Sequence, residues 1–156
     1  MVYLADNQKL KILVVCMGNI CRSPSAQAVL EAKLAQYGIL AEVDSAGTHA
    51  LKGQKPDPRG LSCAQQRGYS MKGFKSRPVI AKDFQRFDVI LASDERNFRD
   101  LLEQAPASAE QKIKRIMSFT ESSFDEVPDP YYGGKRGFEL VLDLLEDACE
   151  GFVKTL

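Results

Sequence analysis

The chain has no excess of charge and no long apolar segment. Its 21 lysine and arginine residues balance 21 aspartate and glutamate residues, so the formal net charge is zero. Nucleic acids and anionic membranes attract proteins through clustered basic charge, so neither is expected as a partner. No apolar run is long enough to span a bilayer. The first residues, MVYLADNQ, lack a basic segment followed by an apolar one, so no signal peptide is expected.

Cysteine and histidine are also scarce. Four cysteines in 156 residues do not suggest the disulfide framework of a small secreted protein, and a reducing cytoplasm fits better. Cys63, Cys149 and the single histidine, His49, are scattered along the chain, so no metal site and no other cofactor is expected. With only one histidine, a cysteine–histidine pair would need a fortunate contact in the fold.

Repeats, low-complexity tracts and domain linkers are absent from the sequence. The length and the 44% hydrophobic content fit a single domain over residues 1–156. Apolar runs predict strands at 11–15, 41–47, 88–93 and 112–119. Caps and apolar periodicity predict helices at 24–37, 57–68 and 94–105 and from 137 to the end, with a short helical turn within 74–87 and a long polar loop at 122–136.

Strands that alternate with helices predict an α/β fold. We expect a three-layer sandwich with a central four-stranded parallel sheet and helices on both faces, joined by right-handed crossovers. In such folds ligands bind beyond the carboxyl ends of the strands. Cys16 follows the first predicted strand, and Ser45 and Ser93 lie at the ends of the next two, so the three should share one edge of the sheet.

The stretch VCMGNICRSP has the features of an anion-binding turn. Residues 17–22 provide six backbone N–H groups that a compact loop can point inward, and the following helix adds the positive end of its dipole. Gly18 permits close approach or positive φ, and Asn19 tolerates the left-handed conformation. The predicted phosphate-binding loop comprises Met17, Gly18, Asn19, Ile20, Cys21, Arg22 and Ser23.

Cys16 is the candidate nucleophile of this loop. The donors that bind a phosphate would also stabilise a thiolate, and Arg22 offers a planar fork of donors to the phosphate oxygens. A Walker A loop is excluded, because no Gly-Lys-Ser/Thr follows Gly18. The alternative is an ordinary strand-to-helix turn with two buried thiols. Ser23 has two interpretations of equal weight, as a hydroxyl donor to the sulfur or as the N-cap of a helix whose first residue is Pro24.

An acid is needed to protonate the leaving oxygen of a phosphate ester. Pro-Asp-Pro occurs twice, at 56–58 and 128–130. Asp57 precedes a helical pattern and is explained as an N-cap, whereas Asp129 lies in the long loop, where site residues are common. We therefore predict Asp129 as general acid and then as general base. The alternative is a plain turn aspartate.

Tyr131 and Tyr132 follow Asp129 and are candidates for an aromatic wall beside the loop. Such a wall would favour an aryl leaving group through ring contacts. For either tyrosine the alternative is partial packing in the core with the hydroxyl in water.

The motifs together resemble one known family. VCMGNICRSP and, near the C-terminus, PDPYY look like the signature segments of the low-molecular-weight protein tyrosine phosphatases. VDSAGT, KPDPRG and DVILASDERN also resemble segments of that family, so the similarity covers nearly the whole chain. The resemblance implies Cys16 as nucleophile, Arg22 as phosphate binder and Asp129 as proton donor, in agreement with the residues themselves.

The resemblance also implies supporting roles. Asn19 would hold the loop in shape with help from Ser45, and Ser23 would assist the thiolate. Cys21 matches the family's second cysteine, which can form a reversible disulfide with the nucleophile and protect it from over-oxidation. The alternative for Cys21 is a small buried hydrophobic side chain.

The sequence departs from the family pattern in two places. Many members carry a histidine that supports the loop, and here MKGFKSR has Phe74 in that neighbourhood. The segment THALKGQ, which corresponds to a rim that contacts substrate, has His49 and Leu51 but no aromatic residue.

These observations predict a protein tyrosine phosphatase that hydrolyses phosphotyrosine and small aryl phosphates through a phosphocysteine on Cys16. Expected partners are a tyrosine-phosphorylated protein, phosphate and other oxyanions, and the oligomeric state stays open. One alternative is a thiol-dependent arsenate reductase, but its cysteine relay has no counterpart in residues 69–95. Another is a non-catalytic phosphoprotein-binding module, which would need neither thiolate nor acid.

Overall fold

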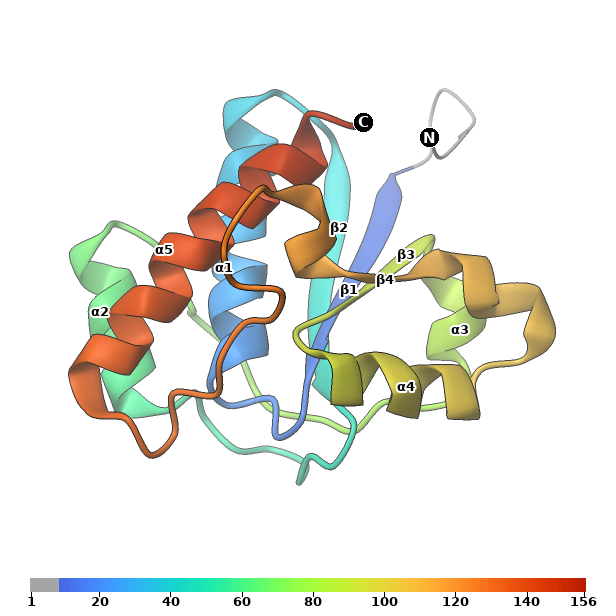
Figure 1. Ribbon diagram of the computed structural model, residues 1–156, viewed down its shortest axis with the longest axis horizontal. Coiled ribbons are helices and arrows are strands. Elements are labelled where there is room, and N and C mark those ends of the chain that lie inside the picture. Colours follow the sequence, from blue (N-terminus) through green and yellow to red (C-terminus); the bar gives the residue numbers. More distant parts are fainter. Residues whose placement is uncertain (1–8) are drawn as a thin grey trace.

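A parallel four-stranded sheet forms the centre of the protein (Figure 1). The structure is a computed structural model that describes residues 9–156, so the expectation about a signal peptide lies outside the described residues. The strands are β1 (Leu10–Cys16), β2 (Ala41–Gly47), β3 (Val89–Ala92) and β4 (Ile113–Arg115), in the order β2-β1-β3-β4. Every neighbouring pair is parallel, as predicted.

Helices cover both faces of the sheet, which confirms the predicted three-layer α/β fold. One face packs against α1 (Arg22–Gln36), α2 (Pro58–Gln66) and α5 (Gly134–Val153), and the other against α3 (Asp83–Arg86) and α4 (Glu95–Gln104). Successive residues of β1 point to opposite layers: Ile12 and Val14 join one core cluster, and Leu13 and Val15 join the other. This double burial explains why the strand is almost entirely apolar.

The C-terminal helix α5 buries the face that its periodicity predicted. Its buried residues include Phe138, Val141, Leu142, Leu145, Ala148, Cys149 and Phe152. They belong to the same core cluster as the inner residues of α1. No helix within residues 9–156 has the length and apolarity needed to cross a bilayer.

Helix α1 begins earlier than predicted, and Ser23 is not its N-cap. The helix begins at Arg22, Cys21 occupies the cap position without a side-chain bond, and Pro24 is the third helical residue. The Ser23 hydroxyl is used elsewhere, within hydrogen-bonding distance of the Cys16 sulfur. Proline is tolerated there because the first-turn N–H groups have no intrahelical partner.

The segment predicted as one strand at 112–119 is half right. Only Ile113–Arg115 form β4, and a 3₁₀ turn, η2 (Ile116–Phe119), follows. The chain turns away from the sheet because Phe119 packs edge-to-face on Phe152 of α5, with ring centroids 5.0 Å apart. A second 3₁₀ turn, η1 (Ala107–Lys112), precedes β4.

The remaining boundaries follow the sequence closely. Asp57 caps α2 by accepting the Arg59 N–H at 2.9 Å, with Pro58 as the first helical residue. Helix α1 ends at Gln36, one residue before the predicted end, and Gly38 takes the left-handed conformation beyond it. The polar stretch 120–133 contains no helix or strand and leads into α5.

Candidate active site

A cavity of about 160 Å³ lies at the carboxyl ends of the strands, where the topology predicts a ligand. Its walls come from the turn between β1 and α1 and from the 120–133 segment, which are far apart in the sequence. The lining residues are Cys16, Met17, Gly18, Ile20, Cys21, Arg22, Asp129, Tyr131 and Tyr132. The structure therefore brings together the three predicted catalytic residues and both predicted wall tyrosines.

Cys16 ends β1, and its side chain is held by the loop that follows. The Asn19 N–H donates to the Cys16 sulfur at 3.3 Å, and the Ser23 hydroxyl oxygen lies 3.1 Å from the same sulfur. The residue is 3% exposed. The Cys16 sulfur therefore lies between a backbone N–H and a hydroxyl, both at hydrogen-bonding distance.

Asn19 connects the 16–23 loop to its surroundings. Among the described residues, Asn19 is the one residue other than glycine that has a positive φ, which is 57°. Its side-chain amide nitrogen donates to the hydroxyls of Ser23 at 2.7 Å and Ser45 at 3.0 Å. Its amide oxygen accepts the backbone N–H of Arg77 at 3.0 Å. Gly18, for which the sequence allowed a positive φ, has a negative one, so the left-handed residue of the loop is Asn19.

Arg77 was not identified from the sequence. Phe74, at the place where many family members were expected to have a histidine, packs against a small apolar cluster that includes Met71. The contact to Asn19 comes instead from the backbone of Arg77, whose guanidinium is fixed by Asp44 and Asp83 at distances of 3.0 to 3.2 Å. In the sequence, Arg77 is one of three basic residues between 72 and 77. Nothing in that stretch indicates a contact with Asn19.

Gly47 was also missed. A Cβ atom at this residue would lie 2.5 Å from the Met17 carbonyl oxygen, so only glycine fits where β2 meets the loop. Beyond it, the N–H groups of Thr48 and His49 donate to the carbonyls of Cys16 and Met17, each at 2.9 Å. The segment after β2 thereby supports the 16–23 loop from one side.

Arg22 is buried and paired. Its Nη1 atom donates to the Asp94 carboxylate at 2.6 Å and to the Val127 carbonyl at 3.0 Å. Burial by itself would lower the pKa of the guanidinium, but Cys16, Asp94 and Asp129 outweigh it, and the net shift is upward. Asp94 is also the N-cap of α4 and accepts the Asn97 N–H at 2.7 Å. The sequence placed Asp94 at the start of the predicted helix 94–105 and gave no sign of its contact with Arg22.

Asp129 is exposed at the cavity mouth, and one of its oxygens accepts the Tyr131 N–H at 3.0 Å. Tyr131 and Tyr132 pack edge-to-face, with ring centroids 4.9 Å apart. They are 44% and 93% exposed, so the alternative of partial core packing is wrong for Tyr132 and does not describe Tyr131 well.

The predicted rim residues lie outside the cavity lining. Leu51 is 68% exposed, and His49 lies beside α4, with Nδ1 3.9 Å from the Asp100 carboxylate. Ser93 reaches the expected edge of the sheet, but its hydroxyl donates to the Val15 carbonyl at 2.8 Å and supports the strand end.

Cys21 lines the cavity as a buried free thiol. Burial, followed by the charges of Asp57, Cys16 and Asp129, raises its pKa to about 12. Its side chain also belongs to the core cluster, so the small-hydrophobe interpretation describes its packing. Within residues 9–156 no group of three or more histidine, cysteine or acidic side chains could hold a metal ion.

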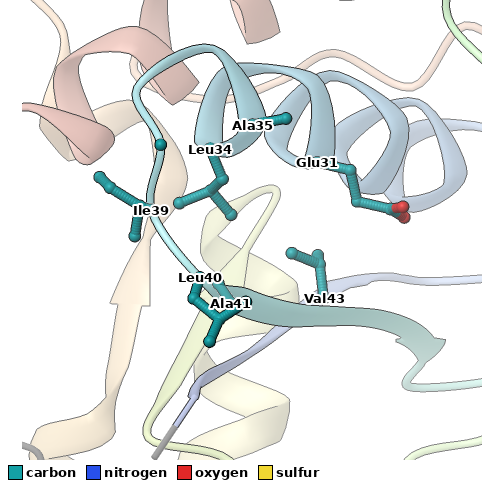
Figure 2. Close-up of a pocket in the computed structure, with 8 residues that line it drawn as sticks. Glu31, Leu34, Ala35, Ile39, Leu40, Ala41 and Val43 are labelled. Carbon is teal, nitrogen blue, oxygen red and sulfur yellow. The ribbon is translucent and has the colours of Figure 1, made fainter. Parts of the chain in front are cut away.

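A second cavity, of about 390 Å³, lies near the opposite end of β2 (Figure 2). It is formed where α1 ends and β2 begins, with lining residues Glu31, Leu34, Ala35, Gly38, Ile39, Leu40, Ala41 and Val43. It contains none of the predicted site residues, because β2 starts there and the carboxyl ends of the strands lie at the other edge.

Comparison with known proteins gives a consistent result. The family model described as low molecular weight phosphotyrosine protein phosphatase matches residues 11–156. A Synechocystis protein named as a low molecular weight protein-tyrosine-phosphatase is 47% identical over 152 residues, covering 94% of this chain and 96% of the relative. The human low molecular weight phosphotyrosine protein phosphatase is 35% identical over 156 residues, covering 97% and 98%.

The fold comparison agrees. A crystal structure of a protein tyrosine phosphatase from Entamoeba histolytica, with Hepes in its active site, superposes with a TM-score of 0.90 at 42% identity. The match covers 94% of this chain and 96% of that one.

Proposed function

The chain belongs to the low molecular weight phosphotyrosine protein phosphatase family, and from this we propose that it hydrolyses phosphotyrosine through a phosphocysteine on Cys16. One observation carries the proposal: Cys16, Arg22 and Asp129 line the same cavity of about 160 Å³. A nucleophile, a cation and an acid within one small cavity are the groups that phosphoryl transfer from an ester requires.

Substrate binding uses the 16–23 loop. The loop N–H groups and the Arg22 guanidinium receive the three non-bridging phosphate oxygens, and the N-terminus of α1 adds the positive end of its dipole. Arg22 keeps its bonds to Asp94 and Val127 through Nη1, which leaves the other edge of its planar fork for the phosphate.

In the first step, the Cys16 thiolate attacks phosphorus. The S–P bond forms as the P–O bond to the aryl group breaks, and Asp129 gives its proton to the leaving oxygen.

In the second step, the Asp129 carboxylate takes a proton from water, whose oxygen attacks phosphorus. The S–P bond breaks, inorganic phosphate leaves, and Cys16 returns as a thiolate. Ser23 donates to the sulfur as it departs. Asn19 donates to the Ser23 oxygen, so the hydroxyl proton must point at another acceptor. The two acceptors within reach are the Cys16 sulfur at 3.1 Å and the Ala46 carbonyl at 3.5 Å, and we propose that the nearer sulfur receives the proton.

Phosphotyrosine on a protein is the proposed substrate class, with small aryl phosphates as further substrates. Tyr131 and Tyr132 form an exposed aromatic wall beside the loop, suited to an aryl ester. His49 and Leu51 lie in the segment after β2, and we propose that their side chains contact residues around the phosphotyrosine. We further propose that residues 1–156 act as one domain and that the protein works in the reducing cytoplasm. Cys16 is kept as a thiol there, and when an oxidant reaches it, Cys21 serves as its redox partner.

The test is phosphate release from an aryl phosphate, with and without thiol reductant and without added metal. We expect turnover by the reduced protein, a loss of turnover on oxidation that reductant reverses, and no turnover by Cys16→Ser. Turnover that survives this substitution would overturn the assignment of the nucleophile. Coupled reduction of arsenate would favour the reductase, and phosphopeptide binding without turnover would favour the binding module.

A further inference from the structure

Asp129 lies in a segment without regular structure, so its position depends on individual contacts. On its N-terminal side, Val127 anchors the segment. The Val127 N–H donates to the Ser93 carbonyl at 2.9 Å, and its own carbonyl accepts from Arg22 at 3.0 Å. Two residues before Asp129 the chain is thus tied both to the sheet and to the predicted phosphate binder.

On the C-terminal side, the contact comes from Arg59 of α2. Its Nη2 atom donates to the Tyr131 carbonyl at 2.9 Å, two residues after Asp129. Its guanidinium also lies 5.7 Å from the centre of the Tyr131 ring. Asp129 is therefore held between an anchor on each side, and the second anchor is a side chain that no step of the reaction uses.

Arg59 is itself held firmly in place. Asp57 accepts from its Nε at 3.0 Å and from its Nη2 at 2.9 Å, and the guanidinium lies 4.8 Å from the centre of the Phe138 ring. The Asp57 N–H donates to the Ile20 carbonyl at 2.8 Å, so the same unit is fixed to the 16–23 loop. Arg59 thereby bridges the loop that holds the nucleophile and the segment that holds the acid.

We propose that Arg59 is a positioning residue that sets the place of the Asp129 carboxyl group relative to Cys16. The role rests on the proposed function, since it acts through the acid named there. Arginine suits it because one planar guanidinium can bond Asp57 along one edge and still donate to a carbonyl, which a lysine ammonium cannot do with the same geometry.

A direct contact between Arg59 and an acidic group of the substrate is the competing role. The Nε and Nη2 atoms are already used, and Asp57 neutralises the charge of the guanidinium. These bonds favour positioning. The two roles differ in what they slow: positioning affects even small aryl phosphates, whereas substrate contact affects phosphopeptides.

The experiment compares Arg59→Met, Arg59→Lys and Asp129→Ala, alone and as the Arg59→Met/Asp129→Ala pair. kcat/KM is measured for small aryl phosphates whose leaving phenols become progressively weaker acids. We expect Arg59→Met to lower kcat/KM about tenfold to a hundredfold for the poorest leaving groups, as for a misplaced catalytic group, and much less for the best. Arg59→Lys should fall between Arg59→Met and the parent.

Two further measurements connect the loss to Asp129. In the Asp129→Ala background, Arg59→Met should cause no additional loss, because the acid it positions is gone. Inhibition by vanadate should be unchanged in Arg59→Met, because the 16–23 loop keeps its own contacts. Far-UV circular dichroism and thermal unfolding establish that each variant is folded.

Lys135→Met is the matched control. Lys135, in the first turn of α5, lines a separate cavity of about 270 Å³ together with Arg59. Its ammonium makes no hydrogen bond or ion pair within residues 9–156. Loss of a neighbouring positive charge alone should leave the leaving-group dependence as in the parent.

Losses that multiply in the double variant would overturn the positioning role, as would a loss by Arg59→Met that is equal for all aryl phosphates or confined to phosphopeptides. If Asp129→Ala itself showed no leaving-group dependence, the acid assignment would fail and the role of Arg59 with it. The two failures are therefore distinguishable.

Discussion

At the scale of single residues, Ser23 and Cys21 show how neighbours decide what a side chain can do. Both lie in the turn before or at the start of α1. The Ser23 hydroxyl accepts from Asn19, and its oxygen lies 3.1 Å from the Cys16 sulfur and 3.5 Å from the Ala46 carbonyl. Burial, and after it the charges of Asp57, Cys16 and Asp129, opposes the ionisation of Cys21 and raises its pKa.

Ser23→Ala should slow the second step of hydrolysis, because the departing sulfur loses a donor. We expect kcat to fall about tenfold to a hundredfold, as for a lost hydrogen bond to a charged group, with kcat/KM for good leaving groups affected less. Rapid-quench measurements should show a larger burst of phenol release than in the parent. An unchanged kcat would show that the hydroxyl has no part in that step.

Disulfide closure between Cys16 and Cys21 should accelerate with pH. Peroxide converts the Cys16 thiolate to a sulfenic acid, and the Cys21 thiolate then attacks that sulfur and releases hydroxide. Because the pKa of Cys21 is raised to about 12, little of it is ionised at neutrality, and the ionised fraction rises about tenfold per pH unit below that value.

The measurement is the closure rate after a peroxide pulse between pH 7 and pH 9, followed by mass spectrometry. In Cys21→Ser no disulfide can form, so the sulfenic acid on Cys16 should accumulate and then be oxidised irreversibly. A closure rate independent of pH would contradict the account of Cys21.

At the scale of elements, the site is assembled where β1, β2 and β3 end, and close backbone packing holds it there. β2 passes so near the 16–23 loop that Gly47 has no room for a side chain. The contacts beyond it, from Thr48 and His49, depend on that approach.

Gly47→Ala should therefore displace the loop. Its Cβ would meet the Met17 carbonyl, and we expect at least about a tenfold weaker inhibition by inorganic phosphate together with lower kcat. Gly38→Ala is the control, because it introduces strain at a positive φ far from the site with open space around it. It should cost about 1 kcal/mol of stability and leave phosphate affinity unchanged. Equal phosphate affinity in the two variants would contradict the role of Gly47.

How far the sequence predicted these elements follows from the range of the interactions. β1, β2 and the cap of α2 were predicted because apolar runs and Asp57-Pro58 are local signals. The start of α1 was wrong because a contact between Ser23 and Cys16 replaced the cap. The second half of the fourth predicted strand was wrong because α5, distant in sequence, draws Phe119 away from the sheet.

The same reasoning applies to the site. Cys16, Arg22 and Asp129 were predicted from their residue types and motifs, and the structure places all three in the lining of one cavity. The roles of Asp94, Arg77 and Gly47 were missed because each depends on a residue that is distant in the sequence. Their respective partners are Arg22, Asn19 and Met17.

At the scale of the whole molecule, the two larger core clusters cover opposite faces of the sheet and carry the fold, and the site lies at the edge of the sheet. The larger cluster joins α1 and α5 across the same face of the sheet. Helix α5 and η2 pack tightly at Gly151, where an added Cβ would overlap the Phe119 carbonyl oxygen.

Gly151→Ala should destabilise the entire protein without touching the site. We expect a loss of about 1–3 kcal/mol in the free energy of unfolding, as for overpacking, measured by urea denaturation. At temperatures where the variant is folded, kcat and KM should equal those of the parent. A stability equal to the parent's would show that α5 and η2 are not held as described.

The central claim is that the thiolate of Cys16 accepts the phosphoryl group in the cavity shared with Arg22 and Asp129. Its most direct test is to mix the enzyme with an aryl phosphate, quench within the burst and locate the phosphoryl group by mass spectrometry, with Ser23→Ala included to slow the second step. The account predicts a phosphoryl group on the Cys16 sulfur that forms as fast as phenol is released. Turnover with no phosphoryl group on Cys16, or with one on another side chain, would contradict it.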